Sequence, residues 1–314
     1  MRKLFLTGTN YLTRPFGMIG KEPARLLASG VWCALILSSN FGQAQDTAAA
    51  DTAAAASPAE VAYPLNLAVG PAGEITIVDL DLPGLWRLAA PDESPTLFFR
   101  GTKLLRQPMN RPRCVVALTD GSVLVGDSAS RDIYRIAADT TELKGLTDGF
   151  IGIPMSLIVD PSGETVYVGD AEKRALFRFP LAGGKPELVA RVNARGLSFG
   201  PEGLLWAITP DDAAVVTIDD QGKVEPRVTG RPFQYPGGIV HVGQTAYVTD
   251  GYGKAIWKIA PGEAPQKWFE GQPLKHPVGI AKTDDALLVA DPHNKQVFRF
   301  KRTDAPTAEP LLPE

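Results

Sequence analysis

Short apolar runs separated by turns of Gly, Asp and Pro recur along most of the chain. The segment 153–192 illustrates the pattern, with apolar runs LIV at 157–159, TVYVGD at 165–170, ALFRF at 175–179 and ELVARV at 187–192. In the third run Phe177 and Phe179 alternate with Arg178, which is the period of two expected of a β-strand. Beyond residue 60 no stretch sustains the apolar spacing of three and four that a helix needs. The pattern therefore predicts four strands in this segment and an all-β fold.

This arrangement of four strands, called a to d in chain order, repeats six times. The units begin at Tyr63, Arg111, Ile153, Asn193, Tyr235 and His276, and consecutive starts are 48, 42, 40, 42 and 41 residues apart. A period near 40 residues is typical of propeller blades, and closing them into a ring protects the sheet edges. We therefore predict a six-bladed β-propeller of four-stranded antiparallel blades over residues 61–314. The tail TAEPLLPE at 307–314 is expected to supply strand d of the last blade, with PAEVAY at 58–63 as a candidate partner across the seam.

The first 44 residues have the order of a secretory signal peptide. Five basic residues precede the apolar run LLASGVWCALILSS at 26–39, and the small residues Gly42 and Ala44 follow it. This order predicts cleavage after Ala44 and a periplasmic or secreted protein without a membrane span after cleavage. The alternative is an uncleaved anchor, although the apolar run is shorter than the roughly 20 residues of a spanning helix. Residues 45–60 contain almost nothing large to bury and are predicted as an Ala-rich flexible leader.

Charge and cysteine content exclude some classes of partner and linkage. The chain has 32 basic and 35 acidic residues, and loss of the signal removes five basic residues and one acidic residue, which leaves a net charge near −7. Nucleic-acid binding is not expected, because it relies on a basic surface. Cys33 lies in the signal, so Cys114 stands alone and no intrachain disulfide can form. We expect a monomer.

The two faces of the predicted propeller differ in sequence. The turns between strands a and b, such as GPAGE, LTDGS and DPSGE, are short hairpin turns without spare side chains. The opposite face collects the d-to-a and b-to-c connections, which differ among the six units. Variable loops on a regular scaffold commonly carry function, so we expect a binding site on this second face.

Residues that enter strand a supply the candidate ligand-binding side chains. These candidates are Arg111, Arg113, Arg195, Tyr63, Tyr235 and His276. Together they could line a cationic and aromatic channel mouth. Because an arginine fork pairs with a carboxylate or a phosphate, the set predicts an anionic ligand. The alternative is that the arginines pair with the aspartates that end strand b, which are described next.

An aspartate ends strand b in five of the six units, at Asp79, Asp127, Asp170, Asp250 and Asp291. Such a ring of carboxylates could bind a metal. A residue that repeats with the blade is better explained as an acceptor for backbone N–H groups of the next loop, and this structural role is our prediction.

Histidine and cysteine give weaker signals. His276 and His293 are expected to approach each other in the last blade, and a histidine pair can bind metal or move protons, but no third ligand is evident. His241, inside strand a of the fifth unit, is interpreted as a packed core or channel residue, and Cys114 as a small buried hydrophobe. We therefore predict no metal site and no cofactor.

The repeated motifs also resemble a known family. Units take the form of a proline, an apolar run, a turn such as the D-x-x-G of 160–163, a run such as YVGD at 167–170 or YVTD at 247–250, and then a run such as IWKI at 256–259, although not every unit has every part. This form resembles NHL repeats, and more broadly the six-bladed propellers of the gluconolactonase, senescence-marker-protein and strictosidine-synthase-like superfamily. The resemblance covers about residues 60–302. It implies the fold rather than one function, because the superfamily spans lactonases, lyases, synthases, sensor domains and binding scaffolds.

The resemblance to the lactonases does not extend to their metal ligands. Those enzymes hold a divalent metal with Glu, Asn and Asp at positions that match Leu65 or Asn66, Met155 and Arg195 here. Leucine, methionine and arginine do not bind a hard cation, which prefers oxygen ligands. The chain also lacks the G-x-S-x-G, C-x-x-C, H-E-x-x-H and phosphate-loop motifs.

We therefore expect a binding or protein-interaction module, for an anionic small molecule or a protein partner, on the face formed by the d-to-a and b-to-c loops. The alternative is a lactonase- or lyase-type enzyme on the same scaffold. In a lyase, His276 would act as the base and Tyr63 or Tyr235 as the acid.

Overall fold

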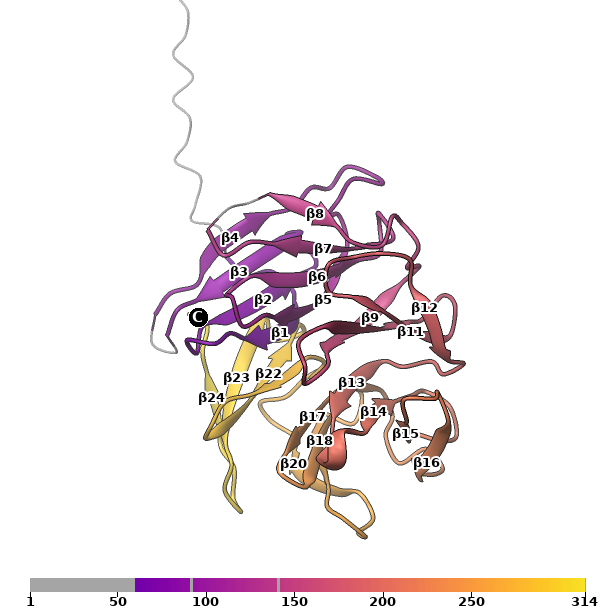
Figure 1. Ribbon diagram of the computed structural model, residues 1–314. Helices are drawn as coiled ribbons and strands as arrows, with labels where there is room; N and C mark the ends of the chain where they lie inside the picture. Colours follow the sequence, from indigo (N-terminus) through magenta and orange to yellow (C-terminus); the bar gives the residue numbers. More distant parts are fainter. Residues whose placement is uncertain (1–59, 91–92, 140–141, 314) are drawn as a thin grey trace, which may run out of the picture. The chain divides into compact units, whose positions relative to one another are not determined.

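The computed structural model describes residues 60–90, 93–139 and 142–313. The predicted signal peptide at 1–44 and, apart from Glu60, the predicted leader at 45–60 lie outside the described residues. The described chain forms six sheets of four antiparallel strands, and in each sheet the strands are neighbours in chain order (Figure 1). Within the described residues the only helical element is the short 3₁₀ turn η1 (Pro201–Gly203). The prediction of an all-β, six-bladed propeller is confirmed.

The strands of each blade follow the predicted units. Blades 1 and 2 contain β1 (Pro64–Val69), β2 (Ile75–Asp79), β3 (Gly84–Leu88), β4 (Thr96–Arg100), β5 (Pro112–Ala117), β6 (Val123–Asp127), β7 (Asp132–Ile136) and β8 (Leu143–Gly145). Blades 3 and 4 contain β9 (Pro154–Val159), β10 (Thr165–Asp170), β11 (Ala175–Pro180), β12 (Glu187–Ala190), β13 (Gly196–Phe199), β14 (Leu205–Ile208), β15 (Val215–Ile218) and β16 (Val224–Val228). Blades 5 and 6 contain β17 (Pro236–Val242), β18 (Thr245–Asp250), β19 (Ala255–Ile259), β20 (Gln266–Glu270), β21 (Ile280–Lys282), β22 (Ala286–Asp291), β23 (Gln296–Lys301) and β24 (Ala308–Pro310).

Six apolar clusters fill the spaces between neighbouring blades. One cluster, for example, joins Leu124 and Ile133 of blade 2 to Val168 and Phe177 of blade 3. The innermost strands β1, β5, β9, β13, β17 and β21 contact one another in that order, and β21 returns to β1. Each blade therefore buries both faces against its neighbours, and burial of apolar area supplies most of the stabilisation of such a ring.

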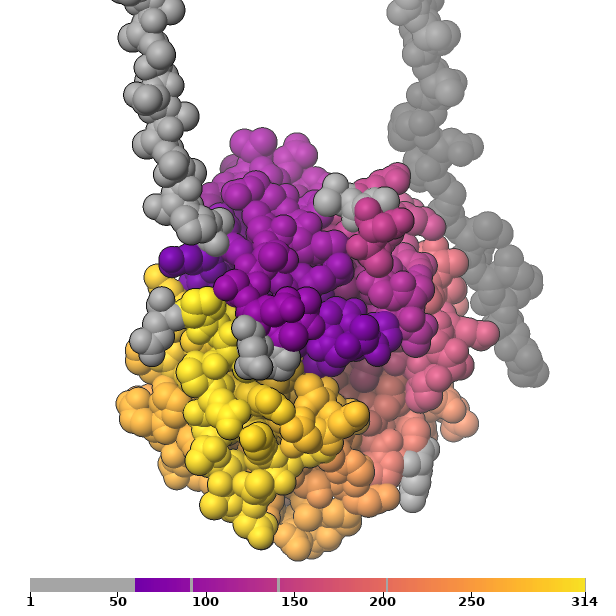
Figure 2. Space-filling model, turned by 90° about the vertical axis from the view of Figure 1, so that its left-hand side faces the viewer, coloured from indigo at the N-terminus to yellow at the C-terminus, as the bar shows by residue number. Residues whose placement is uncertain are grey.

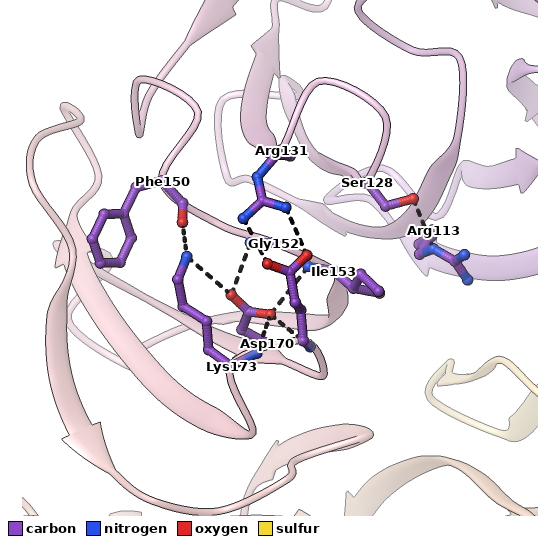
Figure 3. A network of polar contacts seen from close by, with 9 residues as sticks. Arg113, Ser128, Arg131, Phe150, Gly152, Ile153, Asp170 and Lys173 are labelled. Carbon is purple, nitrogen blue, oxygen red and sulfur yellow. Dashed lines mark hydrogen bonds and ion pairs between the residues drawn. The ribbon is translucent and has the colours of Figure 1, made fainter. Parts of the chain in front are cut away.

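The five strand-end aspartates are fully buried and act as predicted. Asp170 accepts backbone N–H groups from Gly152 at 2.8 Å and Ile153 at 3.1 Å, which precede β9, and from Glu172 at 2.9 Å and Lys173 at 3.2 Å, which follow β10 (Figure 3). The other four aspartates accept N–H groups at the equivalent places, through the pairs Asp79 with Tyr63, Asp127 with Arg111, Asp250 with Tyr235 and Asp291 with His276. These carboxylates stabilise the entrance to each inner strand, so their repetition is structural.

The ring closes between blade 6 and blade 1. The tail supplies β24, which pairs with β23, as predicted. Leu311 and Leu312 then pack in one cluster with Val61, Leu67 and other residues of blades 1 and 6. Figures 1 and 2 show the last blade, in yellow, lying against the first, in indigo. The described part of PAEVAY adds Val61 to this cluster and belongs to no strand, so it closes the seam by packing.

Candidate functional site

A cavity of about 440 Å³ opens on the face of the d-to-a and b-to-c connections, and all six blades contribute to its lining. Five of the six candidate residues line it, namely Tyr63, Arg113, Arg195, Tyr235 and His276. Arg111 does not: its side chain is exposed, and its backbone N–H donates to Asp127. The structure thus brings together most of the predicted set on the propeller axis.

A β-bulge at the start of the inner strand explains why Arg113 faces the cavity. In blades 1, 2 and 3 the residue after the proline, which is Leu65, Arg113 or Met155, falls at a break in the register with the neighbouring strand. An unpaired bulge residue re-aims its side chain, and all three line the cavity. The bulge follows from proline, which lacks the N–H that a regular ladder would use.

Two arginines of the cavity, Arg113 and Arg195, have no acidic partner among the described residues. Arg113 is half-buried and donates from Nε to Ser128 Oγ at 2.9 Å (Figure 3). Arg195 Nε is buried and has no hydrogen-bond acceptor among the described residues. None of the ion pairs between described residues includes Arg111, Arg113 or Arg195. The alternative that these arginines form ion pairs with the aspartates that end strand b is therefore wrong.

Electrostatics inside the cavity favour an anion. Burial lowers the pKa of Arg113, and the positive charges of Arg111 and Arg195 lower it further. An arginine nevertheless stays protonated in proteins, so two uncompensated positive charges face the same space. The lining carboxylate of Asp211 does not offset them, because Arg174 binds both of its oxygens, at 2.9 and 3.1 Å.

Imidazole and phenol rings cluster at one side of the cavity, where Tyr235 and His276 belong to the lining. His276 stacks on His293 with ring centroids 4.5 Å apart, which confirms the predicted approach of the two histidines. Tyr235 and Tyr252 pack against His276 at 5.3 and 5.1 Å. Burial lowers the pKa of His276, and the nearby His293 lowers it further. His276 is therefore neutral at pH 7 and could accept a proton.

Metal and thiol chemistry find little support among the described residues. They include no group of three or more His, Cys, Asp or Glu side chains that could hold a metal ion. Leu65, Asn66, Met155 and Arg195 do meet in the cavity, but only Asn66 offers an oxygen ligand, and its Oδ1 already accepts the N–H of Val115 at 3.3 Å. Burial raises the pKa of the Cys114 thiol to about 12, so Cys114 is a buried neutral residue and not a nucleophile.

Several cavity residues escaped sequence reasoning. Arg231 and Phe233 line the cavity from the connection that precedes unit 5, and Tyr252 joins the ring cluster from a b-to-c loop. None of these three residues enters strand a. The motifs RPFQY at 231–235 and GYGK at 251–254, which lie in connections of the predicted working face, are the sequence signals for them.

His241 packs as predicted, inside the propeller and away from the cavity lining. Its ring is only 3% exposed, Nδ1 lies 3.0 Å from Ser198 Oγ, and Trp206 meets it edge-on with centroids 4.8 Å apart. Burial lowers the pKa of His241 to about 4, with a smaller contribution from the positive charge of Lys282. The neutral ring is therefore the form that the fold stabilises.

This pKa predicts a loss of stability on mild acidification. The folded-state pKa of about 4 lies below the ordinary value of 6.5, so between these values the unfolded chain binds the extra proton. The neutral ring of His241 therefore makes its full contribution to the free energy of unfolding above pH 6.5, and this contribution falls as the pH drops towards 4. From pH 7 to pH 5 the free energy of unfolding should fall by about 2 kcal/mol more in the wild type than in a His241→Gln variant, measured by urea denaturation. An equal pH dependence in both proteins would contradict this expectation.

No membrane-spanning candidate emerges from the described part of the chain, where no helix has the length and apolarity to cross a bilayer.

Comparisons with known proteins agree on the fold alone. No family model and no curated protein matches the chain. Among solved structures, virginiamycin B lyase from Staphylococcus aureus superposes with a TM-score of 0.61 at 17% identity, over 81% of this chain and 86% of that one. A nidogen/laminin complex gives 0.60 at 18% identity, over 69% and 84%. Hydrazine synthase from Kuenenia stuttgartiensis gives 0.58 at 15% identity, over 83% and 80%. These neighbours include a lyase and a chain of a nidogen/laminin complex.

Proposed function

We propose that this chain is an exported, NHL-like β-propeller that binds an anionic small molecule in the axial cavity. The observation that carries the proposal is the pair Arg113 and Arg195, which face one cavity and have no acidic partner in the described part of the chain. Leaving a guanidinium half-buried and unpaired is unfavourable, and a ligand carboxylate or phosphate would compensate it. The order of the N-terminal segment supports export to the periplasm or the medium.

Thermal melting and calorimetry test this function directly. The panel is gluconate, glucuronate, citrate and inorganic phosphate, because each carries a group that an arginine fork recognises. We expect at least one of them to raise Tm, since a ligand of the native state stabilises it by mass action. In an Arg113→Gln, Arg195→Gln variant its affinity should fall about a hundredfold, because each charge-assisted hydrogen bond contributes about 1.5–3 kcal/mol.

The matched control is Arg131→Gln. Arg131 lies on the same face but pairs with Glu172 at 2.6 Å outside the cavity (Figure 3), so its loss should leave the affinity unchanged. A panel without any binder, or equal affinity in the double variant, would contradict the proposal.

A lyase activity is the second candidate, and the neutral, cavity-facing His276 is the observation that favours it. A catalytically inactive histidine-to-alanine variant of the virginiamycin B lyase has been solved with quinupristin, and it superposes on this chain with a TM-score of 0.62 at 16% identity. Conversion of quinupristin, followed by liquid chromatography, tests the idea. Activity lost in His276→Ala and retained in His241→Gln would support it, and no conversion by the wild type would refute it for this substrate.

A further inference from the structure

The connection from β4 to β5, residues 101–111, is the longest d-to-a connection between the described strands. Its base is well anchored. Met109 is fully buried in the cluster between blades 1 and 2, Asn110 Nδ2 donates to the Thr102 carbonyl at 3.0 Å, and the Gly101 N–H donates to the Pro83 carbonyl at 2.6 Å. A turn closed by Gln107 N–H and the Leu104 carbonyl at 3.3 Å forms the tip. The fold therefore holds the base of this loop in place, and the tip is a closed turn.

The tip presents two leucines to solvent. Leu104 is 69% exposed and Leu105 is 87% exposed, more than any other large apolar side chain of the described residues. An anchored loop could bury these side chains against the blade surface but instead points them outward. Apolar exposure at a fixed position indicates a contact surface rather than a packing element.

The leucines stand within a strongly basic stretch. No acidic residue occurs between Glu93 and Asp120, whereas five basic residues do: Arg100, Lys103, Arg106, Arg111 and Arg113. None of the five takes part in an ion pair between described residues. This local charge contrasts with the net negative charge of the chain.

We infer that the tip of this loop docks on the surface of an anionic lipid bilayer. Leu104 and Leu105 enter the boundary between headgroups and acyl chains, and Lys103 and Arg106 bind the anionic headgroups on either side. A convex tip with two leucines needs a matching concave pocket on a protein, whereas a bilayer receives any convex apolar tip. Leucine is also under-represented at protein hot spots, which favour Trp, Tyr and Arg.

The docked loop would hold the axial cavity beside the membrane, because β5, which follows the loop, carries Arg113 of the cavity. The inference does not depend on the proposed ligand, since Leu104, Leu105, Lys103 and Arg106 lie outside the cavity lining.

A dye placed on the loop tests the contact without interference from the N-terminal segment. In the full chain with Cys33→Ser, an environment-sensitive fluorophore is attached at Leu105→Cys, while the buried Cys114 stays unlabelled. Equimolar phosphatidylglycerol and phosphatidylcholine vesicles should shift its emission to the blue, and pure phosphatidylcholine vesicles should do so much less. The same dye at Gln221→Cys, in the exposed turn between β15 and β16 on the opposite face, should not respond.

Charge reversal tests the electrostatic half of the inference. A Lys103→Glu, Arg106→Glu variant should lose at least about tenfold in vesicle affinity, because each basic residue near an anionic surface contributes about a factor of five. The control Lys144→Glu, Lys185→Glu makes the same change in charge at exposed positions away from the loop and should bind as the wild type does. The inference is overturned by an absent shift at position 105, an equal shift at position 221, or an affinity that charge reversal leaves unchanged. The inference would also be overturned if the loop bound an acidic protein but gave no response to vesicles.

Discussion

Asp170→Ala should lower the free energy of unfolding by about 4 kcal/mol, because four backbone N–H groups lose their shared acceptor. The carboxylate is fully buried, so water cannot readily replace it. Burial by itself raises the pKa of Asp170, but the N–H groups of Ile153, Gly152 and Lys173 outweigh that effect and hold the pKa below its ordinary value. The ionised form is therefore the stabilising one at neutral pH.

Urea denaturation of the wild type and the variant measures this loss. The pKa of Asp170 is lower in the folded than in the unfolded state, so Asp170 contributes its full stabilisation only at pH values above its ordinary pKa of 3.8. This stabilisation is lost as the pH falls through the pKa of the folded state. Glu172→Gln is the matched control: this neighbouring acid is exposed and forms a surface ion pair with Arg131, so its loss should cost less than about 1 kcal/mol. Similar losses in both variants would show that Asp170 is not the structural centre of its loop.

Removal of residues 307–314 should cost more than about 5 kcal/mol and leave little folded protein. The deletion takes away β24, two buried leucines of the seam cluster and the hydrogen bond from Leu312 N–H to Gln296 Oε1 at 2.7 Å. Each buried leucine alone contributes about 2–5 kcal/mol. Circular dichroism and thermal melting should therefore show an open, largely unfolded ring.

A milder pair of variants keeps this expectation testable if the deletion does not fold at all. Leu312→Ala should lower stability by about 2–3 kcal/mol, since it leaves a cavity between blades 1 and 6. Removal of only Pro313 and Glu314 should change stability by less than about 0.5 kcal/mol, because Pro313 is exposed. A fully stable protein after loss of 307–314 would mean that the seam closes without the tail.

The sequence alone was sufficient for the number of blades and the order of strands. Both depend on local features, namely apolar alternation in runs such as 175–179 and turns such as DPSGE, and sixfold repetition averages out errors in any one unit. Repetition also identified the aspartates as structural, because a ligand site on one axis needs no copy in every blade. The tail was assigned to blade 6 for the same reason, since that unit otherwise lacked strand d.

The membership of the cavity was decided by tertiary structure. Arg111 and Arg113 are two residues apart, yet only Arg113 lines the cavity, because a bulge in β5 re-aims it and the register of a bulge depends on the neighbouring strand. Whether Asp211 would neutralise the arginines was equally undetermined until Arg174, from a different blade, was found to bind it. The repeats determine the strands of a blade through local sequence patterns. The balance of charges on the axis depends instead on side chains that meet only when six blades close into a ring.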